Sequence, residues 1–74
     1  MGRKFRIYSE VLEKDGSQFR LVFEVNGKVE KEETNLYSFD DVLSCSYEFF
    51  KNNLEEHKFD GRRDTYEVSL NYIW

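Results

Sequence analysis

The sequence has few of the residues that small proteins often use for covalent or metal-based stability. It contains no proline, one cysteine and one histidine in 74 residues. The single cysteine, Cys45, cannot form an internal disulfide and cannot build a cysteine-rich zinc site. We therefore expect a domain that depends on side-chain packing and that belongs in a reducing compartment.

Long apolar runs are also missing. No stretch approaches the roughly 18 consecutive apolar residues of a membrane span, and the opening segment MGRKFRIYSE lacks the apolar run of a signal peptide. Arg6 stands where a myristoylation signal would place serine or threonine. We expect a cytoplasmic protein without membrane association.

The residue types needed for catalysis are sparse. His57 falls near the end of a predicted helix, several turns after Cys45, so the two cannot meet as base and nucleophile. The glycines fall in turns or at the start of the chain, and the acidic residues lack the spacing of a calcium loop. We expect a non-enzymatic protein that uses no cofactor and no metal.

Aromatic residues are plentiful. The chain has seven Phe, five Tyr and one Trp, and each ring can bury roughly 150 to 250 Å². A chain of this length forms one domain, so we expect residues 1–74 to share a single core built largely from rings. The net charge of -4 argues against general affinity for nucleic acid but is compatible with a local basic patch.

Two strands, residues 3–13 and 18–26, are predicted on either side of the turn sequence KDGS. A loop of Asp15 and Gly16 alone would scatter apolar side chains over both faces of the hairpin. A loop that also includes Lys14, with Gly16 in the left-handed conformation of a bulged turn, makes one face almost wholly apolar. This second register is the one we predict.

The predicted register also sorts the charges. Its apolar face pairs Val11 with Phe19, Ser9 with Leu21, Ile7 with Phe23 and Phe5 with Val25. Its other face pairs Arg6 with Glu24 and Glu10 with Arg20. Opposite charges directly across a ladder contribute about 0.2 to 1 kcal/mol for each pair, so turn chemistry, apolar pattern and charge favour the same alignment.

A third strand and a helix are predicted next. Asn26-Gly27 indicates a type I′ turn, followed by a charged edge strand over about residues 28–34. From Ser38, the predicted N-cap, with Asp41 at the third helical position, the sequence predicts a helix of about 17 to 20 residues. Its contact stripe is predicted to contain Phe39, Val42, Leu43, Tyr47, Phe50 and Leu54, with Ser46 and Phe49 at the margin.

The last predicted strand is TYEVSLNYIW, residues 65–74, which follows a turn at Asp60-Gly61. Alternation along this strand places Tyr66, Val68, Leu70, Tyr72 and Trp74 on the helix side, and we expect Trp74 to close one end of the core. The order β-β-β-α-β predicts an α+β two-layer sandwich. Its four-stranded mixed sheet has the order 3-2-1-4, with one helix packed on one face.

Two candidate binding surfaces follow from this arrangement. The first is the open sheet face, opposite the helix, where apolar residues would lie inside a charged rim as in protein interfaces; its candidates are Tyr8, Leu12, Val22, Val29 and Ile73. The second is a basic end of the sheet beside Phe59, formed by Arg3, Lys4, Arg6, Lys58, Arg62 and Arg63.

We expect a small acidic protein-interaction module of the kind that phages and mobile elements use as inhibitors or regulators. It would bind a protein target, or a second copy of itself, through the open sheet face or the acidic edge of residues 30–33. Binding of nucleic acid or a phosphate ligand through the basic end is an alternative. A designed protein without function is another, although the helical segments SCS and KNN avoid the strongest helix formers.

Overall fold

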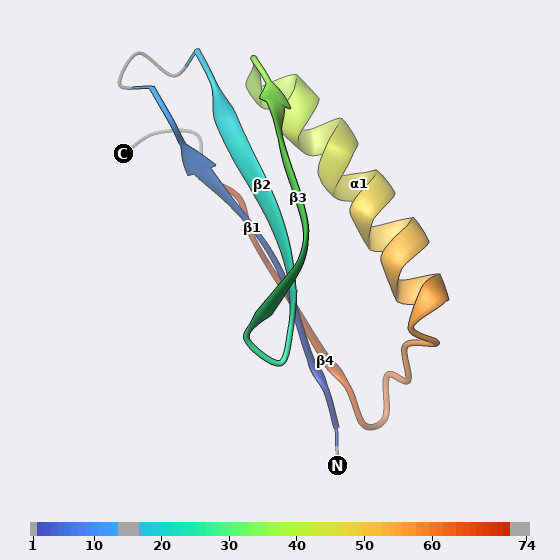
Figure 1. Cartoon of the computed structure of the whole chain (residues 1–74). Helices are drawn as coiled ribbons and strands as arrows, with labels where there is room; N and C mark the ends of the chain where they lie inside the picture. The colour runs from blue at the N-terminus through green and yellow to red at the C-terminus, as the bar shows by residue number, and fades with distance from the viewer. Residues whose placement is uncertain (1, 14–16, 72–74) are drawn as a thin grey trace.

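The computed structural model describes residues 2–13 and 17–71. Its elements are β1 (Lys4–Val11), β2 (Phe19–Val25), β3 (Lys28–Leu36), α1 (Phe39–Glu56) and β4 (Thr65–Ser69). The strands form one mixed sheet in the order β3-β2-β1-β4, with α1 on one face (Figure 1). The predicted two-layer α+β sandwich, with β4 parallel to β1, is confirmed.

The predicted register of the β1–β2 hairpin is confirmed. Ile7 lies opposite Phe23, and Arg6 lies opposite Glu24. The N–H of Leu12 donates to the carbonyl of Gln18 at 2.9 Å, which extends the ladder toward the turn. The predicted bulged loop of residues 14–16 lies outside the described residues.

The β2–β3 connection has the predicted type I′ geometry. Asn26 and Gly27 have φ values of 52° and 84°, the left-handed values that this turn requires at both central positions. Asn26 also binds the start of β1, because its N–H donates to the Lys4 carbonyl and its Oδ1 accepts from the Lys4 N–H, each at 2.8 Å. Strand β3 continues to Leu36, beyond the predicted end near residue 34, since Leu36 pairs with Phe19 and is buried.

Helix α1 begins as predicted. The Oγ of Ser38 accepts the N–H of Asp41 at 3.2 Å, and the Asp41 carboxylate accepts the N–H of Tyr37 at the same distance. Both bonds satisfy backbone donors that would otherwise lack partners at the helix start.

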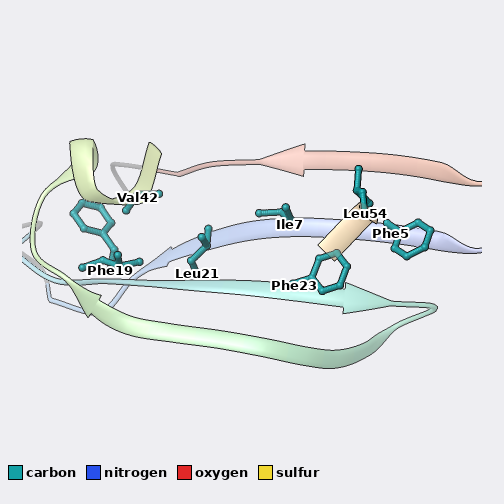
Figure 2. Close-up of a cluster of buried hydrophobic side chains, with 8 residues drawn as sticks. Phe5, Ile7, Phe19, Leu21, Phe23, Val42 and Leu54 are labelled. Carbon is teal, nitrogen blue, oxygen red and sulfur yellow. The ribbon is translucent and has the colours of Figure 1, made fainter. Parts of the chain in front are cut away.

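The core lies between α1 and the sheet. Its buried side chains come from every layer-facing element except β4: Phe5, Ile7, Phe19, Leu21, Phe23, Leu36, Val42 and Leu54. Figure 2 shows Val42 above Phe19 at one end and Leu54 above Phe5 and Phe23 at the other. The rings of Phe5 and Phe23 stack with centroids 6.0 Å apart, but only three of these eight buried residues are aromatic, fewer than a core built largely from rings would have.

The prediction for the contact stripe of α1 was partly wrong. Val42, Asn53 and Leu54 are buried, whereas Leu43, Tyr47 and Phe50 are 45%, 65% and 44% exposed. The backbone of the helix lies over β2, β1 and β3, and the helix meets β4 through the side-chain contact of Phe50 with Tyr66. One flank of the predicted stripe therefore faces solvent above β4.

Strand β4 was also expected to contribute more to the core than it does. Val68 pairs with Ile7 and shares its face of the sheet, but its side chain is 47% exposed because α1 does not reach it. The strand ends at Ser69, and Asn71 is then held by Ser9, whose hydroxyl accepts the Asn71 N–H at 2.7 Å. Tyr72, Ile73 and Trp74, including the predicted core position of Trp74, lie outside the described residues.

Candidate protein-interaction surface

The open sheet face carries a network of ion pairs. Arg20 on β2 lies between Glu32 on β3, at 2.8 Å, and Glu10 on β1, at 3.1 Å. Hydrogen bonding to Glu32, reinforced by Glu10, raises the pKa of Arg20 further above its usual value. Each of these carboxylates is partly exposed, so the network lies at the surface. Within it, the arginine is paired with carboxylates of the same chain.

Arg6 forms a second ionic row across the same face. Its guanidinium lies 3.9 Å from Glu24 on β2 and 3.7 Å from Glu67 on β4. It also lies 4.6 Å from the centroid of the Tyr8 ring, within the range of a cation–π contact. Burial, followed by the Glu24 carboxylate, raises the pKa of Tyr8.

The predicted apolar residues of this face are not gathered into one exposed patch. Val22 lies between Tyr8 and Glu32 in the ladder and is completely buried, although no helix covers this side. The long side chains around it therefore exclude water. Leu12 and Val29 are 43% and 51% exposed but lie at opposite ends of the face. Ile73 lies outside the described residues.

The basic end is brought together only in part. Arg3 is engaged by Asp64, with Nη2 and Oδ2 3.0 Å apart, and Phe59 packs against the rings of Phe5 and Tyr66. Arg6 belongs to the ionic face described above. The exposed cations Lys4, Lys58, Arg62 and Arg63 form no ion pair with the residues that the structure describes.

Asp64 is the most strongly bound acid in the described chain. Its carboxylate accepts the Arg3 side chain, the Arg3 N–H at 2.9 Å and the Asp60 N–H at 2.9 Å. These donors, led by the Arg3 side chain, hold the pKa of Asp64 well below its usual range. They join the start of β1 to the loop before β4, so they explain Asp64 as a structural residue.

The three carboxylates at the acidic edge of β3, residues 30–33, each have a hydrogen-bond or ion-pair partner among the described residues. Glu30 lies 3.1 Å from Nε2 of His57, and Lys31 lies 3.6 Å from Glu56 on α1. Glu32 belongs to the Arg20 network, and Glu33 accepts the N–H of Asn35 at 2.9 Å. The edge therefore presents few free carboxylates.

The structure keeps Cys45 and His57 in separate environments. His57 packs against the rings of Phe5 and Phe23, with centroids 5.5 Å and 5.9 Å away. Burial raises the pKa of the Cys45 thiol, and nearby carboxylates raise it further, which opposes formation of the reactive thiolate. Within residues 2–13 and 17–71, no group of three or more histidine, cysteine or acidic side chains could hold a metal ion. No helix in that part of the chain has the length and apolar character of a membrane span.

A different surface combines four exposed apolar side chains with two half-buried ones. It consists of Leu43, Tyr47 and Phe50 on α1 with Tyr66, Val68 and Leu70 on or beside β4, and we call it the α1–β4 surface. The three helical residues follow the spacing of one helix stripe. The stripe faces β4, because the rings of Phe50 and Tyr66 meet edge to face with centroids 5.0 Å apart. Burial raises the pKa of Tyr66 to about 12.

A groove adjoins the α1–β4 surface. It has a volume of about 500 Å³, and its lining residues are Tyr47, Phe50, Lys51, Leu54, Glu55, Lys58 and Phe59. Its apolar lining residues are Tyr47, Phe50 and Leu54 on α1 with Phe59, and its charged ones are Lys51 and Glu55 on α1 with Lys58 just beyond the helix. The α1–β4 surface therefore has the apolar centre and charged rim of a protein-binding site.

The sequence carries one signal for this surface that the predicted single stripe left out. Val42-Leu43 and Phe49-Phe50 are pairs of adjacent apolar residues, and neighbours in a helix point about 100° apart. The apolar arc is consequently wider than one contact with the sheet can bury.

Comparison with known protein families, with curated proteins and with solved structures gave no match.

Proposed function

We propose that the chain is a non-enzymatic protein-binding module that acts through the α1–β4 surface. One observation carries the proposal: Leu43, Tyr47, Phe50 and Val68 are all between 44% and 65% exposed, and the contact of Phe50 with Tyr66 places this flank of α1 on the side of the sheet that Val68 shares with Ile7. Contiguous exposed apolar surface on a small domain is typical of an interaction site. A small acidic inhibitor or regulator would use such a surface to engage its target.

The chemistry of the surface favours a protein over a small polar ligand. Tyrosine and phenylalanine are enriched where protein interfaces concentrate binding energy. Tyr47 is both the most exposed large apolar residue of α1 and a lining residue of the adjoining groove. On the open sheet face, by contrast, Arg6 and Arg20 already have carboxylate partners within the chain.

Selection from a random peptide library tests this proposal. We expect peptides enriched on the intact chain to lose about tenfold or more in affinity on Tyr47→Glu, a change of about 1.4 kcal/mol. Tyr37→Glu is a matched control, since Tyr37 is 60% exposed but lies between β3 and α1. NMR chemical-shift changes on the labelled chain should map to Phe50 and Val68.

Two results would contradict the proposal. Equal loss of binding in the two tyrosine variants would show that Tyr47 has no special role. Shift changes confined to Tyr8, Leu12 and Val29 would assign binding to the open sheet face instead.

A further inference from the structure

The helix layer of this protein covers only part of its sheet. Neighbouring strands lie about 4.8 Å apart and a helix with its side chains is about 10 Å wide. One helix therefore covers roughly half of a four-stranded sheet. Because α1 packs over β2, β1 and β3, the uncovered part is the β4 side (Figure 1).

The uncovered part is bounded by two apolar surfaces, a floor and a side wall. The floor is the helix-facing side of β4, where Val68 is 47% exposed, and the side wall is the flank of α1 that carries Leu43 and Tyr47. Phe50 on the side wall and Tyr66 on the floor are in contact, with ring centroids 5.0 Å apart. An occupant must touch both surfaces to cover these residues.

We propose that the α1–β4 surface binds an amphipathic α-helix of a partner protein, lying over β4 beside α1. This inference rests on the proposed function and names the class of partner. A helix placed there contacts Val68 below and Tyr47 at its side through one apolar stripe. A strand added to the free edge of β4 would lie in the plane of the sheet and would leave Tyr47 and Leu43 exposed.

The charged rim specifies the flank of the partner helix. Lys51 and Lys58 line the groove, together with Glu55. Neither lysine has an ion-pair partner within the described residues. Acidic residues beside the apolar stripe of the partner helix would meet these two cations, so the expected ligand is an amphipathic helix with an acidic flank.

A display library built on a single amphipathic helix tests the inference. Its apolar stripe is fixed as leucine, and the positions on either side are randomised. We expect selection on the full chain to enrich glutamate and aspartate on one flank. Exchanging those acids for lysine in a selected peptide should weaken binding about tenfold, and Val68→Lys in the chain should abolish it.

Matched variants separate binding from folding. Val29→Lys is the control for Val68→Lys, because Val29 is 51% exposed on the opposite edge strand. The double variant Lys51→Glu, Lys58→Glu should lose the acidic peptide and gain the lysine-exchanged one. Circular dichroism checks that each variant retains its helix and sheet.

Other outcomes would overturn the inference. If helical peptides fail while extended peptides bind along the β4 edge, the partner is a strand, and the proposed function survives. Concentration-dependent dimers that Val68→Lys dissolves would make the occupant a second copy. If no peptide of either type binds at the α1–β4 surface, both the inference and the proposed function fail.

Discussion

Asn53 lies in the interior, on the sheet-facing side of α1, and is 1% exposed. Neither its Oδ1 nor its Nδ2 has a hydrogen-bond partner among the described residues. A buried amide without partners costs about 1 to 3 kcal/mol by mutational measures. This position could not be identified from the sequence, because the predicted stripe ends at Leu54 and the helix is rotated relative to that prediction.

Replacing Asn53 should therefore increase stability. We expect Asn53→Leu, which keeps the branching at Cγ and replaces the unpaired polar atoms with somewhat larger methyl groups, to raise the free energy of unfolding by about 1 to 3 kcal/mol. Urea denaturation followed by circular dichroism measures the change. Asn52→Leu is the matched control at an exposed position, where we expect a change within about 0.5 kcal/mol. A loss of stability in Asn53→Leu would show that the carboxamide is needed.

At the scale of elements, α1 ends in a Schellman motif that lacks glycine. Lys58 has a φ of 53°. Its N–H donates to the Glu55 carbonyl at 3.1 Å, and the N–H of Phe59 donates to the Leu54 carbonyl at 3.0 Å. Glycine is the usual residue at such a left-handed position because it has no Cβ to clash.

Glycine at this helix end should stabilise the protein. We expect Lys58→Gly to raise the free energy of unfolding by about 0.5 to 1 kcal/mol, since it removes the strain of the left-handed backbone. Lys58→Ala removes the same charge but retains a Cβ, so it separates the backbone effect from electrostatics. Thermal and urea unfolding of the two variants should differ in this direction. Equal stabilities would mean that the turn holds Lys58 without strain.

Strand registers and turns could be predicted because several local signals agree. Alternating apolar residues, the Asn26-Gly27 pair and the cross-strand charges all favour the observed alignment. The rotation of α1 could not be predicted in the same way. Leu43 and Phe50 are as apolar as Val42 and Phe49, and only the position of the helix over the sheet decides which are buried.

The prediction of the binding surface was limited because it did not account for long side chains that cover their neighbours. Val22 was expected on an exposed face, but the side chains around it bury it completely. Arg3 and Asp64 are 61 positions apart in the sequence, and no local sequence pattern indicates that they pair. Contacts of this kind are set by the assembled fold.

At the scale of the whole molecule, Asp64 links stability to pH. Its pKa is lowered in the folded state, whereas an unfolded aspartate has a pKa of about 3.9. The stabilisation is therefore complete above about pH 5 and declines as the pH falls through the unfolded pKa toward the lower folded pKa. Acid should unfold the protein partly by protonating this carboxylate.

A pH series with one variant tests this link. We expect Asp64→Asn to be less stable than the parent chain at neutral pH and to lose less stability between about pH 5 and about pH 2. Urea midpoints at each pH provide the measurement. Asp60→Asn is the control, since it changes an exposed carboxylate in the same loop. An unchanged pH profile in Asp64→Asn would assign the acid sensitivity to other groups.

The two ionic rows on the open sheet face, around Arg6 and Arg20, have a consequence for solubility. They shield Val22 from water and at the same time present hydrated charge to the solvent on the back of the sheet. Larger proteins commonly achieve the same shielding with an additional layer of helices. Here the arginine side chains substitute for that layer. A domain only two layers thick can therefore leave one face of its sheet uncovered without exposing an apolar surface that would promote aggregation.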